Sequence, residues 1–298
     1  MSAAADTTGL TFRQDYFADH AAWRALVSLL HDTFGIDIGP LMQLGGPDAT
    51  SMPFGWFAGD GTLAANLSAF AMPLLINGRR INAAGLQSGA VRPPWRGRGL
   101  YRDVTTKALD WCAAQGFEAI VLYTDKPALY EPYGFRTLPM HSFSGDAPTP
   151  VFATQGRSID PGNADDLALL QDLLARREPV SDALAVVSSP AMFLINTQLD
   201  PDVRLTFIEQ LSAVIAWKLD GGTLILLDVL AASIPPLAAI LGGLGVRPDR
   251  LEVFFRPDKL GWNGEPTPVS AHGTHFMIRG LDGLALDAPA MLSPMADF

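Results

Sequence analysis

The chain has 298 residues, 48% hydrophobic and only 17% charged, so it can bury a large core as one or two domains. Its 31 acids and 21 bases give a formal charge of −10, which argues against a general nucleic-acid binder and a polybasic membrane-surface protein. The single cysteine, Cys112, excludes an intramolecular disulfide and a cysteine-based zinc cluster, and it points to a reducing, cytoplasmic location.

Neither the amino terminus nor the most apolar stretch predicts a membrane association. The first ten residues contain no Lys or Arg and no apolar core, so they do not resemble a secretory signal. Residues 223–245 are long enough to span a bilayer, but Asp228 and Pro235-Pro236 interrupt them. We expect a protein that contacts neither a membrane nor nucleic acid; a homo-oligomer is compatible with the sequence.

The acidic charge is concentrated in the second half. Residues 1–145 carry 11 bases and 12 acids, whereas residues 146–298 carry 10 bases and 19 acids. The turn-rich segment 144–150 lies at this change and can continue neither a helix nor a central strand. We therefore predict two domains, residues 1–145 and residues 146–298.

The first domain shows an alternating pattern of helices and strands. Asp19 is a suitable N-cap for a first helix, and Gly116 is placed to close a second one. Turns at residues 59–61 and 77–78 separate successive antiparallel strands. The predicted strands cover residues 10–16, 51–57, 63–75, 81–91 and 119–123, and the predicted helices cover residues 20–34 and 100–115.

The second domain is predicted to be a degenerate copy of the first, with helices and strands in the same order. A helix over residues 160–177 is followed by an irregular segment to Asp202. The fold class is α/β (α+β), with each domain a mixed, mostly antiparallel twisted sheet flanked by helices. The remaining predicted elements are strands over residues 203–211, 212–219, 223–230 and 251–255 and a helix over residues 235–241.

The most informative segment, residues 91–100, connects a predicted strand to a predicted helix. Four arginines stand within eleven residues that contain no acid: Arg92, Arg96, Arg98 and Arg102. Gly97 and Gly99 allow tight turns, and the following helix offers unpaired amides and the positive end of its dipole. A Gly-x-Gly sequence alone is more often an ordinary strand-to-helix turn. Such a turn does not require four arginines, so their presence favours a binding loop. The segment predicts a pyrophosphate-binding loop, although it is neither a Walker loop nor a dinucleotide fingerprint.

With this loop the chain resembles the GNAT N-acetyltransferases, whose acetyl-CoA loop reads Arg/Gln-x-x-Gly-x-Gly/Ala after Val-x-Pro. Here Val91-Arg92-Pro93 precedes Arg96-Gly97-Arg98-Gly99-Leu100, and the early Gly97 departs from the strict consensus. About thirty residues later, Tyr130-Glu131-Pro132-Tyr133-Gly134-Phe135 matches the family pattern Tyr-x-x-x-Gly-Phe. Two motifs in the expected order and separation are stronger than either motif alone.

The resemblance implies acetyl transfer from acetyl-CoA to a primary amine, most readily a small cationic one, by direct attack in a ternary complex without a metal. It assigns CoA binding to Val91, Arg96, Gly97, Arg98, Gly99 and Leu100, through strand-like pairing with the pantetheine arm and through amides and charge at the pyrophosphate. Tyr130 matches the tyrosine that protonates the departing thiolate. A core aromatic is the alternative for Tyr130, and Tyr133 is the competing phenol.

The second domain narrows the resemblance to the Eis-type tandem acetyltransferases. Residues 231–236 contain no glycine and no base, so the second copy should not bind CoA. Residues 276–282 are similar to the end of the second domain in that family. Eis-type proteins continue into a sterol-carrier-like domain, which we expect this chain to lack because it stops at Phe298. The terminal carboxylate of that family can act as a base, so Phe298 is a catalytic candidate, with a frayed terminus as the alternative.

The remaining polar candidates have ordinary interpretations. His272 and His275 have a possible metal spacing, but without a carboxylate or cysteine cluster they read as loop histidines. Cys112 lies within a predicted helix without a nearby His, which favours packing. Glu131 and Asp125 could bind a cationic substrate, although solvated loop charges are the default.

Three aromatic residues, Trp56, Phe57 and Phe70, could line an acceptor pocket or pack in the sheet. A catalytically silent acyl-CoA-binding or interaction protein with the same fold is the alternative function.

Overall fold

The computed structural model describes residues 4–151, 154–269 and 273–298. Its helices are α1 (His20–Phe34), α2 (Leu100–Ala114), α3 (Ala164–Arg176), α4 (Pro190–Leu199) and α5 (Leu237–Leu244). No helix in these ranges combines the length and the apolar character that a membrane crossing requires.

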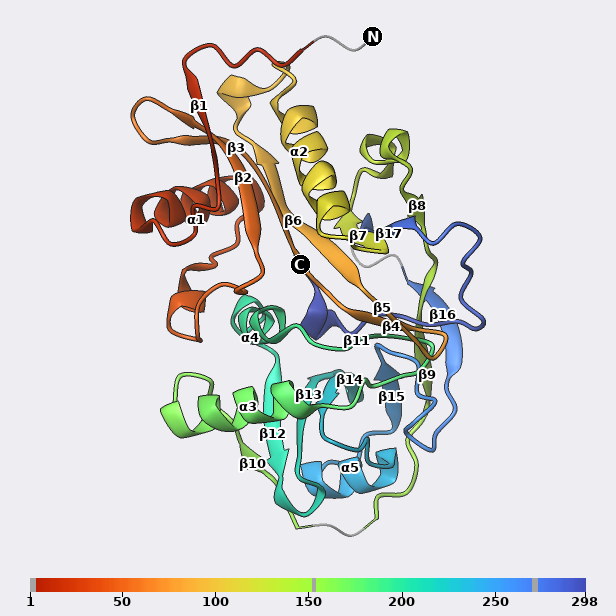
Figure 1. Cartoon of the computed structure of the whole chain (residues 1–298). Helices are drawn as coiled ribbons and strands as arrows, with labels where there is room; N and C mark the ends of the chain where they lie inside the picture. Colours follow the sequence, from red (N-terminus) through yellow and green to blue (C-terminus); the bar gives the residue numbers. More distant parts are fainter. Residues whose placement is uncertain (1–3, 152–153, 270–272) are drawn as a thin grey trace.

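Two seven-stranded sheets form the two halves of the molecule, one above the other in Figure 1. The first contains, in spatial order, β1 (Leu10–Gln14), β2 (Met52–Ala58), β3 (Leu63–Ala71), β6 (Ala83–Val91), β7 (Ala119–Thr124), β17 (His275–Gly280) and β8 (Arg136–Thr137). The second contains β10 (Arg157–Ser158), β12 (Arg204–Ile208), β13 (Ala213–Asp220), β14 (Thr223–Leu230), β15 (Arg250–Val253), β9 (Met140–Asp146) and β16 (Glu265–Val269). A small third sheet contains β11 (Leu184–Val186), β4 (Leu74–Ile76) and β5 (Arg79–Ile81).

The two large sheets share one arrangement of strands. In the first sheet β6 is antiparallel to β3 and parallel to β7, and in the second β14 is antiparallel to β13 and parallel to β15. The sixth strand of each sheet is antiparallel to the fifth. The prediction of two similar domains with mixed, mostly antiparallel sheets flanked by helices is confirmed.

Each large sheet takes a strand from the other half of the sequence. β17 lies between β7 and β8, so residues 275–280 belong to the first sheet. β9 lies between β15 and β16, so residues 140–146 belong to the second. The boundary near residue 145 stays a prediction, and the strands of each sheet are not contiguous in the sequence.

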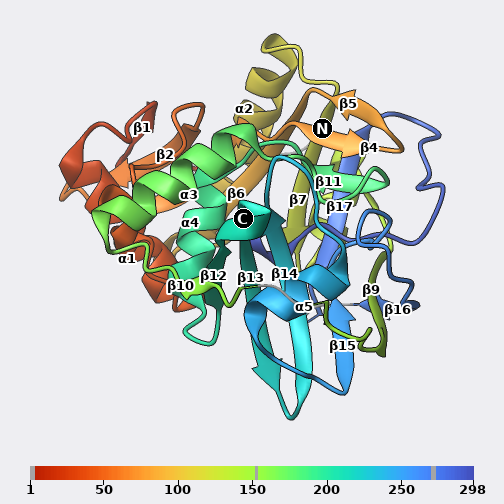
Figure 2. The ribbon, with the colours of Figure 1, turned by 90° about the horizontal axis from the view of Figure 1, so that it is seen from below.

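The helices cover opposite faces of each sheet. α1 contacts β3 and β6 on one face of the first sheet, here called the α1 face, whereas α2 contacts β2, β3 and β6 on the other, the α2 face. In the second sheet α5 packs on one face, and α3 and α4 pack on the other. Figure 2 shows this sheet from below with α3 and α5 on its two sides.

The local signals for α1 and α2 are confirmed. The carboxylate of Asp19 accepts hydrogen bonds from the amides of Ala21, at 2.8 Å, and Ala22, so it caps α1 as predicted. Gly116 follows α2 with a φ of +74°, a left-handed conformation that favours glycine at a helix end.

Several predicted segments differ from the structure. The segment expected to be irregular before Asp202 contains β11 and α4; α4 has five consecutive buried residues, Ala191–Ile195, and so lacks the helical alternation of apolar and polar positions. The single strand expected over residues 63–75 is divided into β3 and β4, with Pro73 between them. The helix expected over residues 235–241 begins two residues later and extends to Leu244.

Candidate active site

The two central strands of the first sheet separate after three residues. β6 pairs in parallel with β7 only over Ala83–Gly85. Beyond Gly85, a bulge opposite Leu67 places Ser88 at a φ of +59°, and the side-chain amide of Asn66 donates to the Ser88 carbonyl at 2.9 Å. Bulges bend a strand and release it from its ladder. β7 meanwhile stays paired with β17 to Thr124, so a wedge-shaped opening forms between β6 and β7.

The loop at the end of β6 presents free backbone amides to an anion. Gly97 and Gly99 have φ values of +76° and +77°, and α2 begins directly after Gly99. In the described part of the chain, no acceptor is found for the amides of Gly97, Arg98 and Gly99, whereas the Arg96 amide donates to the Pro93 carbonyl. Free amides at a helix N-terminus form an anion-binding site.

The arginines of this loop do not all face the same ligand space. Arg92 pairs with Asp32 and donates to Ser28 Oγ at 2.9 Å, which ties the loop to α1. Arg98 forms an ion pair with Asp6 at 3.2 Å and donates to the Thr8 carbonyl at 2.7 Å. Arg96 is exposed, and its Nε donates to the Val91 carbonyl at 3.0 Å, so its charge remains at the loop surface.

The remaining predicted loop residues are structural in part. Val91 pairs with Ala65 of β3 at the end of β6, and Leu100 is buried against Ala64 and Ala65. Gly99 lies against the amino-terminal segment, since a Cβ at this position would be 3.3 Å from the Ala5 Cα. The loop is therefore fixed by its neighbours on both sides.

Tyr130 lies on the α2 face, close to the bulge of β6. It follows the turn η3 (Pro127–Leu129), is 7% exposed, and packs at 5.8 Å from the Phe135 ring. Its hydroxyl is hydrogen-bonded to the hydroxyl of Tyr101 in the first turn of α2. The Tyr101 hydroxyl in turn fills the space that a Cβ at Gly89 would need. The ring of Tyr130 is thus part of the core, and its hydroxyl lies beside the opening.

Both phenols are protonated at neutral pH. Burial raises the pKa of Tyr130, and the hydrogen bond from Tyr101 opposes this rise. Burial and the neighbouring Tyr130 hold the pKa of Tyr101 well above its usual value. Tyr133, the competing phenol in the turn η4 (Glu131–Tyr133), is half-buried and packs against the same apolar cluster. Tyr101 follows the Arg-Gly-Arg-Gly-Leu motif directly, yet its contact with Tyr130 joins elements 29 positions apart, which the sequence does not reveal.

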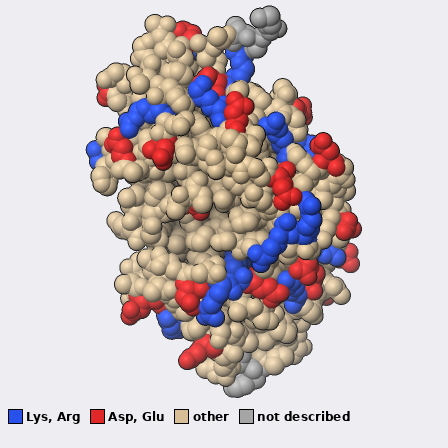
Figure 3. Space-filling model, in the orientation of Figure 1, with Lys and Arg blue, Asp and Glu red and all other residues tan. Residues whose placement is uncertain are grey.

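The carboxyl end of the described chain lies on the α1 face of the same opening. The Phe298 ring packs at 5.4 Å from the Phe70 ring and at 5.6 Å from the Tyr123 ring, measured between centroids. A Cβ at Gly85 would be 3.1 Å from the Phe298 ring, which places this ring where β6 and β7 separate. Figure 1 marks the C-terminus in the middle of the molecule beside β6. Figure 3 shows a hollow on this face, with an acidic group at its floor.

Only one of the three candidate acceptor-pocket aromatics reaches this region. Phe70 contacts Phe298, whereas Phe57 packs against Tyr16 at 5.0 Å and the Trp56 indole donates to Asp103 at 2.8 Å.

The other polar candidates have ordinary surroundings in the described structure. Burial raises the pKa of the Cys112 thiol to about 12, so this thiol is inert at neutral pH. Glu131 and Asp125 are exposed, and Asp125 pairs with Lys126 at 3.4 Å. His275 pairs with Thr124 in the sheet, and His272 lies outside the described residues. Within residues 4–151, 154–269 and 273–298, no group of three or more His, Cys, Asp or Glu could hold a metal ion.

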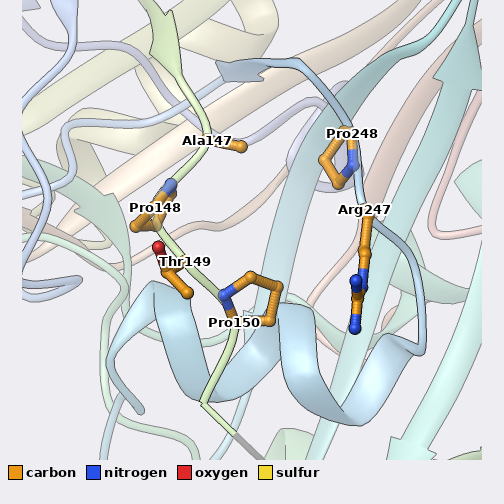
Figure 4. A pocket seen from close by; sticks show the side chains of 6 residues that line it. All are labelled: Ala147, Pro148, Thr149, Pro150, Arg247 and Pro248. Carbon is orange, nitrogen blue, oxygen red and sulfur yellow. The ribbon is translucent and has the colours of Figure 1, made fainter.

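A surface depression of about 270 Å³ lies elsewhere, in the second domain. Figure 4 shows it between the chain after β9 and the chain before β15. No Cys, His, Asp or Glu lines it, and neither Tyr130 nor Phe298 is among its lining residues. Its lining residues are Ala147, Pro148, Thr149, Pro150, Arg247 and Pro248.

Comparison with known families agrees with this geometry. Residues 43–138 match the sequence profile of the acetyltransferase (GNAT) domain. The chain contains a GNAT acetyltransferase domain. The matched range runs from before β2 to the end of β8 and includes both the arginine–glycine loop and Tyr130. No curated protein sequence matches the chain.

Solved structures extend the GNAT fold to both halves of the chain. A GCN5-related N-acetyltransferase from Kribbella flavida is 17% identical, with a TM-score of 0.58 over 93% of this chain and 73% of its own. Eis1 from Mycobacterium abscessus is 17% identical, with a TM-score of 0.59 over 92% of this chain and 74% of its own. A probable N-acyltransferase of unknown function from Enterococcus faecalis is 13% identical, with a TM-score of 0.59 over 92% and 73%. The prediction of a tandem GNAT-like fold is confirmed, and the fold is similar to that of Eis1.

Proposed function

We propose that the protein transfers an acetyl group from acetyl-CoA to a primary amine, most readily a small cationic amine, in the cytoplasm. One observation carries the proposal. The opening between β6 and β7 has the Tyr130 hydroxyl near its α2 face and the chain's carboxyl end on its α1 face. An acid for the leaving group and a base for the amine would then act from opposite sides of one thioester.

The strand edge and the loop together fit the shape of CoA. Beyond Gly85, the side of β6 that faces the opening has no partner among the described strands, so an extended pantetheine arm can pair with it as an added strand. The amides of Gly97, Arg98, Gly99 and Leu100 and the charge of Arg96 can then hold the pyrophosphate at the N-terminus of α2. Arg98 adds charge nearby, although Asp6 neutralises part of it.

The proposed reaction is a direct attack. The neutral amine adds to the thioester carbonyl, a C–N bond forms, and the C–S bond then breaks with its electron pair on sulfur. The thiolate takes a proton from Tyr130, and the Tyr101 hydroxyl can donate to the phenolate that remains. The family resemblance assigns the amine's proton to the terminal carboxylate of Phe298, whose ring lies on the α1 face.

Replacement of Tyr130 tests the acid. Tyr130→Phe keeps the buried ring and removes the proton, so we expect kcat to fall by about 10²-fold or more, with little change in CoA affinity. Tyr133→Phe is the matched control, because it removes a half-buried phenol from the same loop, and it should stay near wild type. The measurements are thiol release with polyamines, aminoglycosides and lysine peptides as acceptors, and calorimetry with CoA.

Two outcomes would change these conclusions. Full turnover of Tyr130→Phe at saturating acetyl-CoA would remove Tyr130 from the mechanism. Calorimetric binding of CoA by the wild-type protein without thiol release from any amine would replace the enzyme with a silent acyl-CoA-binding protein.

A further inference from the structure

The last residues of the chain are held at three points around the opening. Ser293, which caps the turn η7 (Pro294–Ala296), donates from Oγ to Asp228 of β14 at 2.8 Å. Asn196 of α4 donates from its side-chain amide to the Asp297 carbonyl at 2.8 Å. Phe298 is fixed between Phe70 and Tyr123. Asp297 therefore lies between two anchored neighbours, and its position is defined.

The Asp297 carboxylate has no cationic partner among the described residues. Its Oδ1 accepts a hydrogen bond from the Phe298 amide at 2.9 Å. Among the described residues, no Lys, Arg or His forms an ion pair with it. Asp297 is exposed as a residue, although protein packs closely around its carboxyl group. An unpaired carboxylate attracts a cationic ligand.

Within the described elements packed around it, Asp297 is the one side-chain carboxylate without an ion-pair partner. Protein packed around the carboxylate raises its pKa, and its charge contributes to the high pKa of Tyr123 on β7, which therefore stays protonated. The sequences of β3, β6 and α4 contain no titratable residue. Asp228 on β14 is paired with Arg177. β9 contributes His141, whose amide donates to the Ala290 carbonyl and whose buried Nδ1 has no hydrogen-bond partner in the described structure.

We propose that the side chain of Asp297 binds the ammonium group of the acceptor and takes the proton that must leave it before attack. This assignment rests on the proposed acetyl transfer, and it places the base on a side chain instead of the terminal carboxylate of Phe298. The ammonium gives one proton to Asp297, which passes it to solvent through the hollow. After attack, the nitrogen loses a second proton. Tyr130 gives one proton to the thiolate, and the second nitrogen proton returns the resulting phenolate to the phenol. The net products are the amide, free CoA and one proton.

The role of Asp297 predicts a specific pH dependence. Because the pKa of Asp297 is raised in the folded protein, its basic form is present only above that raised pKa. We expect kcat/KM to fall as the pH drops through it, at a pH above the ordinary range of aspartate. The same shift means that ionised Asp297 opposes folding at neutral pH, so a neutral replacement should not lower the melting temperature.

The test compares Asp297→Asn with Asp287→Asn in the full chain. Asparagine retains the oxygen that accepts from the Phe298 amide, so the tail should stay in place. We expect Asp297→Asn to lower kcat/KM by about 10²-fold, to abolish the acid limb of the pH profile, and to melt no lower than wild type. Asp287 is an exposed carboxylate of the same carboxyl-terminal segment, and its replacement should leave rate and profile unchanged.

The outcomes separate this inference from the proposed function. If wild type releases thiol with an amine and Asp297→Asn keeps both rate and acid limb, Asp297 is not the proton acceptor. If a Gly-Ser extension after Phe298 abolishes activity while Asp297→Asn does not, the terminal carboxylate is the base. If wild type releases no thiol with any amine of the panel, the proposed function itself is wrong.

Discussion

At the scale of single residues, the loop before α2 would bind a phosphate mainly through its backbone. Arg92 is held by Asp32 and Ser28, and Arg98 is held by Asp6 and Thr8. The amides of Gly97, Arg98 and Gly99, in contrast, have no acceptor in the described structure. Charge introduced beside these amides should therefore affect CoA binding more than loss of Arg92 does.

Gly97 allows this to be tested without a steric change. Its φ is +76°, and a Cβ there would have no atom within 4 Å, so Asn and Asp, which tolerate this conformation, both fit. We expect Gly97→Asp to weaken CoA binding by about tenfold or more through repulsion of the pyrophosphate, and Gly97→Asn to weaken it much less. Calorimetry at one fixed salt concentration measures both. An equal loss in the two variants would mean that the backbone conformation, and not the charge, determines affinity.

The sequence predicts the motifs of the site but not the contacts that control them. The loop and Tyr130 could be identified because they occupy fixed positions in local patterns. Asp32, the acidic partner of Arg92, lies 60 residues away, and Thr8, a partner of Arg98, lies 90 residues away, so the spacing of the arginines cannot reveal them. Tyr101 and Asp297 were missed for the same reason, since folding alone brings them to the opening.

At the scale of elements, the two sheets differ in the region of the opening. In the second sheet, the region that corresponds to the opening between β6 and β7 is filled. β14 pairs with β15 only as far as Leu226. Two residues later the Asp228 carboxylate, 1% exposed, accepts from Arg177 at 2.5 and 3.1 Å and from Ser293 at 2.8 Å. A buried ion pair and the chain's own tail lie beside β14, in the region that corresponds to the opening. This agrees with the prediction that the second copy binds no CoA.

The ion pair should contribute strongly to stability. Asp228→Asn leaves the Arg177 guanidinium, 8% exposed, without a counter-charge, and we expect it to lower the free energy of unfolding by about 3–5 kcal/mol. Asp200→Asn removes the partly exposed partner of Lys218 and should cost less than about 1 kcal/mol. Urea unfolding of the two variants gives the comparison. A similar small loss in both would show that Arg177 finds another partner or water.

Local sequence patterns predict helices and strands better than they predict which strands pair with each other. The capping of α1 by Asp19 and the strands of the first half follow from residues close in the chain. α4 was missed because consecutive buried residues give no helical alternation. No local pattern specifies that β9 pairs with β15 or that β17 pairs with β7, because these partners are chosen by the completed sheets.

At the scale of the whole molecule, the exchange of β9 and β17 makes each half depend on the other. Without β17, β7 has no antiparallel partner and β8 has no neighbour in the sheet. Without β9, β15 loses its antiparallel partner and β16 is detached. The proposed site is shared in the same way, because the loop and Tyr130 come from the first half and Asp297 and Phe298 from the second.

Separate expression of the halves tests this dependence. A cut between Thr149 and Pro150 leaves every strand intact, yet fragment 1–149 lacks β17 and fragment 150–298 lacks β9. We expect each fragment alone to melt without cooperativity and to aggregate through its unpaired strand edges. Co-expression should yield a complex that elutes as one species, melts cooperatively and releases thiol. The uncut chain is the control in circular dichroism, size-exclusion and activity measurements. A cooperative melt of fragment 1–149 alone, with acetyl transfer, would show that neither β17 nor the carboxyl-terminal tail is needed, because residues 1–149 would then contain the whole active site.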